Sequence, residues 1–149
     1  MMKMRFTWIK DTSEWEKAIP LIAQVSWQAG AHLAQQMKSN SLTDWENVLV
    51  CWNGKELVGF CALLKQDIVK ETTLTPFIGV VFVAEKYRGR KISQQLVKRA
   101  EKKAVELGFE KVFIATSHKS LYEKFGYHKI GTKEDIFDRF LFVYQKDLL

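Results

Sequence analysis

The chain has few of the residues that carry metal or covalent chemistry. It contains two cysteines, three histidines and two prolines among 149 residues, and no Cys/His cluster has the spacing of a metal site. The GxxxxGKS/T loop of nucleoside triphosphatases and the GxGxxG fingerprint of dinucleotide enzymes are also missing. We therefore expect no bound metal and neither of these two nucleotide-binding classes.

Long apolar runs are absent as well. No segment approaches the roughly 20 residues of a membrane span, and the N-terminal segment MMKMRFTWIK lacks the apolar centre of a signal peptide. Hydrophobic residues make up 47% of the chain and charged residues 27%, which is typical of a globular domain. We expect a single domain over residues 1–149, located in the cytoplasm and without membrane contact.

The two cysteines, Cys51 and Cys61, flank a hairpin signal, the sequence NG at 53–54. If that pair is the two-residue turn, Cys51 lies opposite Glu56 and Cys61 opposite Glu46, so the thiols are not cross-strand neighbours. We expect both thiols to be free and buried.

The formal net charge of +6 raises nucleic acid as a candidate partner, because Lys and Arg neutralise backbone phosphates. The basic residues are spread along the chain and interleaved with acids, as in the segment KRAEKK at 98–103. A solvated helix face and one local phosphate site account for this pattern, and we expect no nucleic-acid partner.

Hydrophobic periodicity and turn residues divide the chain into helices and strands. Ser13 and Glu16 form a capping-box pattern that starts a helix, and Pro20 is expected to kink or divide that helix. Further helices are predicted over 31–38, 92–107 and 120–124, and strands over 5–10, 47–52, 56–64, 76–83, 111–115, 127–130 and 139–145.

The strands at 76–83 and 111–115 are joined by the helix over 92–107, which Gly108 ends. Such a β-α-β unit makes its two strands parallel, with a right-handed crossover. We predict an α/β fold: a mixed sheet of about six to seven strands, antiparallel in its N-terminal part, with this parallel unit at its centre and flanking helices. Ligands of such sheets favour the carboxyl ends of the parallel strands.

The segment VFVAEKYRGRKIS at 81–93 carries the strongest functional signal. It is a strand that ends in a basic turn and opens directly into a helix. The first N–H groups of a helix have no intrahelical partner, and the macrodipole adds positive potential there. A phosphate or pyrophosphate is the ligand expected at this turn.

Together with the motif SLYEKFGY at 120–127, this segment resembles the GCN5-related N-acetyltransferase (GNAT) superfamily. The family's phosphate loop, Gln/Arg-x-x-Gly-x-Gly/Ala, falls on Arg88, Lys91 and Ser93, so two small residues are replaced here. We expect ordinary helical dihedrals at Lys91, which any L-residue tolerates. The resemblance implies acetyl-CoA as co-substrate, with its pyrophosphate on Arg88, Gly89, Arg90, Lys91, Ile92 and Ser93 and its pantetheine arm along Val81, Phe82 and Val83.

Tyr122 matches the family tyrosine beside the coenzyme sulfur. When an amine attacks the acetyl thioester, a thiolate leaves, and a phenol with an ordinary pKa of about 10 is still protonated at pH 7 and can donate to it. The resemblance therefore implies that Tyr122 is the general acid. Cys51 and Cys61 have no base nearby in the chain, which favours direct attack over a covalent acyl-enzyme.

The family often uses a glutamate on the strand before the phosphate loop as base, but 76–83 contains no acid. The candidates are Asp67, Glu71 and His118, or a bound water. The acceptor is expected over the first two helices and the loops 65–75 and 132–138, with Asp67, Glu71 and Trp27 as predicted binding residues. Other aromatic and acidic candidates there are Trp52, Phe77, Phe137, Glu134, Asp135 and Asp138.

These features predict an N-acetyltransferase that moves an acetyl group from acetyl-CoA to a primary amine of a small molecule or a peptide. The main alternative is a non-catalytic module that keeps acyl-CoA as a sensor or regulatory ligand. We expect a monomer or a homodimer.

Overall fold

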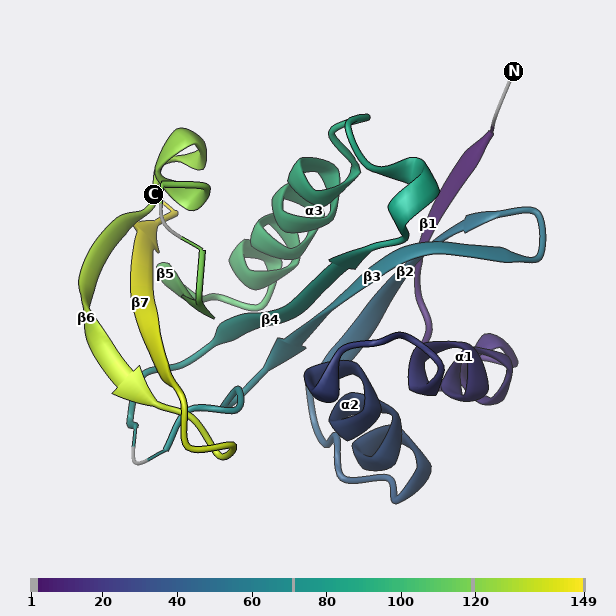
Figure 1. The fold of residues 1–149 in the computed structure, drawn as a ribbon, viewed down its shortest axis with the longest axis horizontal. Helices are drawn as coiled ribbons and strands as arrows, with labels where there is room; N and C mark the ends of the chain where they lie inside the picture. The colour runs from purple at the N-terminus through teal and green to yellow at the C-terminus, as the bar shows by residue number, and fades with distance from the viewer. Residues whose placement is uncertain (1–2, 71, 119, 149) are drawn as a thin grey trace.

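A seven-stranded sheet organises the protein, in the order β1-β2-β3-β4-β5-β7-β6 (Figure 1). The computed structural model describes residues 3–70, 72–118 and 120–148. Neighbouring strands are antiparallel except β4 and β5, which are parallel, so the predicted mixed sheet is confirmed. The strands are β1 (Met4–Trp8), β2 (Asn47–Asn53), β3 (Glu56–Leu64), β4 (Phe77–Val83), β5 (Lys111–Thr116), β6 (His128–Glu134) and β7 (Phe140–Asp147).

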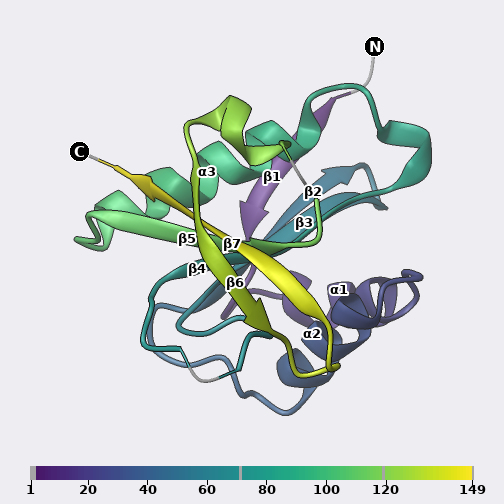
Figure 2. The same ribbon diagram turned by 60° about the vertical axis from the view of Figure 1, so that its left-hand side comes forward.

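Helices cover both faces of the sheet. Figures 1 and 2 show α1 and α2 on one face of β2–β4 and α3 on the other. None of the described helices is long and apolar enough to cross a membrane. The helices are α1 (Glu14–Ala23), α2 (Gln28–Lys38) and α3 (Ile92–Glu106), with short 3-10 turns η1 (Glu85–Tyr87) and η2 (Tyr122–Phe125).

Strand β2 shows how one sheet forms two cores. Val48 and Val50 pack in the cluster formed with α1 and α2, whereas Leu49 and Cys51 pack in the cluster formed with α3. Successive side chains of a strand point to opposite faces, and here both faces are covered. The five residues between Asn47 and Asn53 are therefore all apolar, without the polar alternation of a half-exposed strand.

The start of α1 differs from the prediction. Ser13 makes no side-chain cap hydrogen bond, so the predicted capping box does not form. Instead, the Thr12 hydroxyl accepts a hydrogen bond from the Glu14 N–H at 3.2 Å. The helix also continues through Pro20 to its end at Ala23, so the proline does not divide it.

The β2–β3 hairpin is present, but its turn lies one residue later than predicted. Asn53 pairs with Glu56, which makes Gly54-Lys55 the two-residue turn. Gly54 has a φ of 62°, a left-handed conformation that favours glycine. The glycine therefore determines the position of the turn.

The later turn and a β-bulge after Cys51 change the register of the cysteines. Cys51 lies opposite Gly59, and Cys61 lies opposite Leu49. Both thiols are free and buried, as predicted, and burial raises the pKa of each thiol above its ordinary value. Neither side chain is therefore suited to act as a thiolate nucleophile.

The parallel strands β4 and β5 pair where they begin and then separate. Their registered pair is Phe77 with Phe113, and α3 connects the two strands, so the predicted β-α-β unit is confirmed. A register irregularity between β3 and β4 accompanies Val80, which has a φ of 54° and bends β4. Figure 1 shows β4 continuing beside β3 while β5 lies with β7 and β6. The carboxyl ends of the two parallel strands are therefore open to a ligand.

Candidate active site

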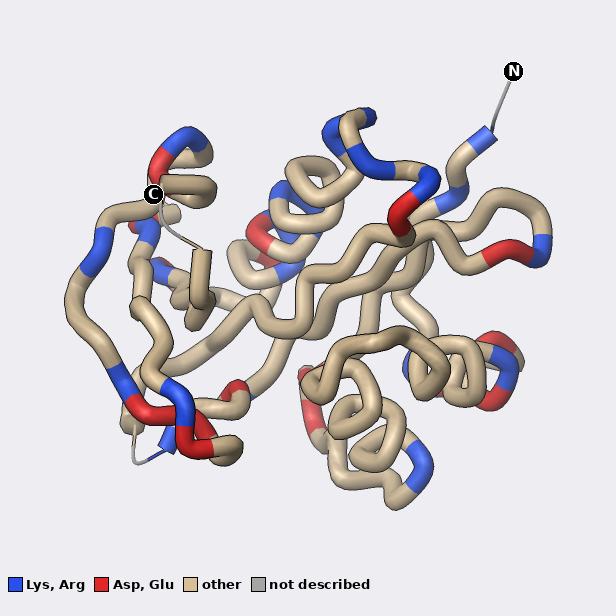
Figure 3. The backbone as a smooth tube through the Cα atoms, viewed as in Figure 1, with Lys and Arg blue, Asp and Glu red and all other residues tan. Residues whose placement is uncertain are grey.

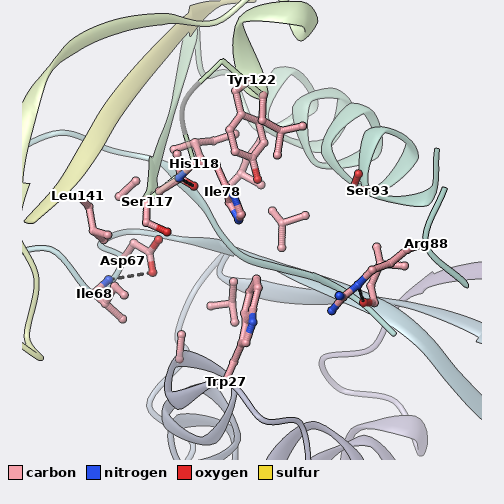
Figure 4. A pocket seen from close by; sticks show the side chains of 18 of the residues that line it. Trp27, Asp67, Ile68, Ile78, Arg88, Ser93, Ser117, His118, Tyr122 and Leu141 are labelled. Atoms are coloured by element: carbon pink, nitrogen blue, oxygen red, sulfur yellow. Dashed lines mark hydrogen bonds between the residues drawn. The ribbon is translucent and has the colours of Figure 1, made fainter. Parts of the chain in front are cut away.

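A cavity of about 840 Å³ lies between the separating strands β4 and β5. Its walls come from the start of α2, the loop after β3, β4, the loop before α3, the end of β5, and η2. Figure 4 shows Arg88 and Ser93 at one end of the cavity, Asp67 and Leu141 at the other, and Tyr122 between them. The fold thus brings together segments that are more than 50 residues apart in the chain.

One end of the cavity has features that favour an anion. The loop before α3 has four cationic residues between positions 86 and 91, as Figure 3 shows. A hydrogen bond of 3.2 Å runs from the Gln95 N–H to the Lys91 carbonyl, so the N–H groups of the first helical turn precede it and have no intrahelical acceptor. The free N–H groups, the macrodipole and the cations together favour a phosphate here.

Most of the residues predicted to bind the co-substrate line this cavity, but two side chains do not. The Phe82 side chain packs against Phe60 and Trp27, with ring centroids 5.3 and 5.4 Å away, on the α1–α2 face of the sheet. The Arg90 guanidinium lies 5.6 Å from the centre of the Tyr87 ring. The predicted residues that line the cavity are Val81, Val83, Arg88, Gly89, Lys91, Ile92, Ser93 and Tyr122.

Lys91 contradicts the expectation of helical dihedrals. It is the N-cap residue of α3 and has a φ of 61° and a ψ of 25°, in the left-handed region. A residue with a Cβ is disfavoured there by about 1–2 kcal/mol. The family's glycine suits this conformation, so Lys91 adds a charge to the loop at the cost of backbone strain.

Replacing Lys91 with glycine is therefore expected to stabilise the fold and weaken co-substrate binding. We expect the free energy of unfolding to rise by about 0.5–1 kcal/mol, because the relief of strain exceeds the added chain entropy. The Kd for CoA is expected to rise severalfold as one cation is lost. Lys91→Ala is the matched control, because it removes the charge and keeps the strain. Equal thermal midpoints for the two variants would contradict this account.

Tyr122, the candidate general acid, is held rigidly at the cavity wall. Its side chain is 5% exposed, and its ring contacts those of Phe125, Tyr127 and Tyr144. Figure 4 shows the Tyr122 hydroxyl pointing into the cavity. Burial, with smaller contributions from nearby acidic groups, raises the pKa of this hydroxyl above its ordinary value. The phenol is therefore protonated throughout the neutral range and can donate a hydrogen bond or a proton.

Asp67 places a carboxyl group beside β4, a strand that contains no acidic residue. It follows β3, is 8% exposed, and accepts a hydrogen bond of 2.8 Å from the Ile68 N–H. Its carboxyl lies against Gly79 of β4: a Cβ added to Gly79 would be 2.7 Å from the Asp67 carboxyl carbon. Burial raises the pKa of Asp67 to about 6, against the opposing effect of the Ile68 N–H. A carboxylate with this pKa is well matched to general-base work near neutral pH.

The other base candidates are less well placed. His118 lines the cavity but is exposed, and its backbone N–H donates to the Thr116 hydroxyl at 3.0 Å. Glu71 lies outside the described residues. Asp67 is therefore the base candidate that combines burial with a position in the cavity.

The remaining acidic candidates for the acceptor site are engaged elsewhere. Glu134 and Asp138 both pair with Lys70, at 3.2 and 2.8 Å. Asp135 is fully buried and pairs with Arg139 at 2.8 Å. These acids form ion pairs within the loops and do not line the cavity.

Among the aromatic candidates, Trp27 lines the cavity as predicted. Trp52 and Phe77 are core residues, with exposed fractions of 4% and 0%. Phe137 packs against His32, with ring centroids 6.0 Å apart, beside the cavity. The loops after β3 and before β7 line the end of the cavity opposite Arg88, which is the candidate acceptor end. The other three aromatic candidates do not line the cavity.

Comparisons with known proteins decide the family. A family model described as the acetyltransferase (GNAT) family matches residues 10–127, which is most of the chain. The chain belongs to the GNAT acetyltransferase family. Membership in this family supports acetyl transfer as the class of activity. A search among curated proteins finds no match.

Solved GNAT structures share the fold at low sequence identity. An acetyltransferase from Bacillus subtilis in complex with CoA is 22% identical, with a TM-score of 0.69 over 99% of this chain and 100% of that one. A GNAT acetyltransferase from Elizabethkingia anophelis with acetyl-CoA bound is 18% identical, with a TM-score of 0.66 over 97% of each chain. An aminoglycoside 6'-acetyltransferase type Ii is 17% identical, with a TM-score of 0.72 over 99% of this chain and 98% of that one. These neighbours support the GNAT fold.

Two residues that shape this cavity of the GNAT fold were not singled out from the sequence. Gly79 makes room for the Asp67 carboxylate, and an isolated glycine within a predicted strand is a signal of such a close approach. Arg139 lines the acceptor end of the cavity, close to Leu141 in sequence. No local pattern distinguishes Arg139 from the many other cations of the chain.

Proposed function

We propose that this GNAT protein is an N-acetyltransferase that transfers the acetyl group of acetyl-CoA to a primary amine by direct attack. The observation that carries the proposal is the set of groups that line one cavity. A helix start that favours phosphate lies at one end, the buried Asp67 carboxyl at the other, and the Tyr122 hydroxyl between them. This arrangement matches a long phosphorylated thioester that meets an amine at its acyl end.

Binding and orientation come first in the proposed mechanism. The basic loop and the first N–H groups of α3 hold the pyrophosphate, and the backbone of Val81–Val83 aligns the amide-rich pantetheine arm as an added strand would. Both reactants are then fixed in one cavity. Such positioning can supply about 7–11 kcal/mol of the reduction in the barrier.

The chemical step uses Asp67 and Tyr122. Asp67 accepts a proton from the amine as the amine nitrogen bonds to the thioester carbonyl carbon. The carbon–sulfur bond then breaks, and Tyr122 donates its phenolic proton to the departing sulfur. The proton on Asp67 returns to Tyr122 through solvent, so both groups are restored. The products are the acetylated amine and free CoA.

One experiment separates this proposal from a non-catalytic acyl-CoA module. The purified protein is incubated with acetyl-CoA and a panel of polyamines, amino acids, aminoglycosides and peptide N-termini, and free thiol is measured. In parallel, the thermal midpoint is recorded with CoA, which should raise stability by about 2.7 kcal/mol at 100 times its Kd. We expect both stabilisation and thiol release. Stabilisation by CoA without thiol release for any amine would favour the non-catalytic module. If neither stabilisation nor thiol release were observed, CoA binding itself would be refuted.

A further inference from the structure

Arg139 is a cation fixed at the acceptor end of the cavity. Its guanidinium contacts the fully buried Asp135 through Nε and Nη2, each 2.8 Å from Oδ2. Asp135 is held in turn by the N–H groups of Phe137 and Arg139, at 2.9 and 2.8 Å from Oδ1. The Phe137 ring lies 5.2 Å from the guanidinium carbon. The side chain is thus held in one orientation by a carboxylate and a ring.

The guanidinium still has donors for a ligand. It has five N–H groups in a planar fork, and the contact with Asp135 uses the edge that carries Nε and Nη2. The Arg139 side chain remains 51% exposed although its partner is fully buried. An arginine that is oriented on one edge and exposed on the other is suited to bind a carboxylate.

Arg139 and Asp67 belong to the same end of the cavity. Their two loops are joined by a hydrogen bond of 2.7 Å from the Ile136 N–H to the Ile68 carbonyl, and Val69 and Asp135 form a β-bridge. Figure 4 shows Asp67 and Leu141 on the side opposite Arg88. The base candidate and a fixed cation therefore face the acceptor together.

The charges that line the cavity select among amine acceptors. Asp67 is the carboxylate among the described lining residues, whereas Arg88 and Lys91 lie at the phosphate end and Arg139 at the acceptor end. A polycation such as a polyamine or an aminoglycoside would meet one buried acid and a fixed cation. An acceptor with one amine and one carboxylate would match both groups.

We propose that the acceptor is an aminocarboxylate of the amino-acid type, with its amine directed to Asp67 and its carboxylate bound by Arg139. Ile68 and Leu141 line the same end, Trp27 lies between the two ends opposite Tyr122 (Figure 4), and these side chains favour an apolar part between or beside the two charges. The inference rests on the proposed acetyltransferase activity. It narrows that activity to one chemical class of acceptor.

Matched acceptors test the assignment without altering the protein. We would measure kcat/KM at pH 8 for leucine, phenylalanine, β-alanine and 4-aminobutyrate, each against its own carboxamide, with spermidine and kanamycin as polycations. We expect at least one acid to exceed its amide by tenfold or more, and both polycations to be poor acceptors. The amine of an α-amino acid amide is less basic than the amine of the acid, so less of it is protonated at pH 8. A preference for the acid therefore cannot arise from the protonation state of the amine.

Variants of Arg139 provide the second part of the test. Arg139→Lys keeps a cation beside Asp135 but loses the planar fork, and we expect KM for the preferred acid to rise tenfold or more with the KM for acetyl-CoA unchanged. Arg139→Gln combined with Asp135→Asn avoids a buried unpaired charge and should abolish the preference for acid over amide. Lys98→Gln on the exposed face of α3 is the matched charge control.

Equal turnover of acids and amides by the unaltered protein would overturn the assignment and leave the acetyltransferase proposal intact. The same holds if the two Arg139 variants retain the full preference for the acid. No thiol release with any of these amines, despite stabilisation by CoA, would instead overturn the proposed activity together with this inference.

Discussion

Replacing Tyr122 with phenylalanine is expected to lower kcat for acetyl transfer by about 10²–10⁴-fold, the range of a lost general acid. The departing thiolate would then leave without a proton donor. Binding of acetyl-CoA should change little, because the ring and its contacts with three neighbouring aromatic rings are retained. Steady-state kinetics and the CoA-dependent thermal shift measure the two quantities separately.

Tyr127→Phe is the matched control for this prediction. Tyr127 is also buried, but its hydroxyl donates to Glu101 at 2.7 Å and does not line the cavity. Loss of that hydrogen bond is expected to cost about 1–3 kcal/mol of stability with kcat unchanged. Similar kcat losses in both variants would mean that the hydroxyl of Tyr122 has no special role.

Replacing Asp67 with asparagine is expected to lower kcat/KM by about 10²–10⁴-fold and to stabilise the fold at pH 8. Burial raises the pKa of Asp67 to about 6 from an ordinary value of 3.8, so the folded state binds a proton more tightly than the unfolded state does. The stabilisation that the protonated Asp67 carboxyl contributes is therefore fully present below pH 3.8 and is lost as the pH rises through about 6. Once Asp67 is ionised, the free energy of unfolding is lower by roughly 2–3 kcal/mol than when Asp67 is protonated.

The pH dependence provides the measurement for Asp67. For the unaltered protein, kcat/KM should rise with pH through about 6, as the carboxyl loses its proton. The thermal midpoint of Asp67→Asn should exceed that of the unaltered protein at pH 8, and the two should converge below pH 4. A variant that is inactive and also less stable at pH 8 would indicate that Asp67 is a structural residue.

The sequence predicts the part of the fold that depends on local pattern. The apolar stripe of α3, the glycine at its end and the strands on either side specify the β-α-β unit. The basic turn before the helix is likewise a local pattern, and it predicts the candidate anion site. These features depend on short-range geometry, which periodicity and turn residues encode.

Features that depend on contacts between distant segments were not predictable in the same way. The Asp67 carboxylate, in the loop after β3, lies against Gly79 of the neighbouring strand β4, and Arg139 reaches the cavity from the turn before β7. The left-handed dihedrals of Lys91 also arise from how the loop must meet α3, against the preference of the residue itself. Local sequence pattern therefore leaves Asp67 as one of several base candidates.

A crystal structure of the protein with CoA tests the central claim most directly. We expect the pyrophosphate on the N–H groups that open α3, the pantetheine along Val81–Val83, and the sulfur within about 3.5 Å of the Tyr122 hydroxyl. An empty cavity at saturating ligand, or a thiol that lies away from both Tyr122 and Asp67, would contradict the account.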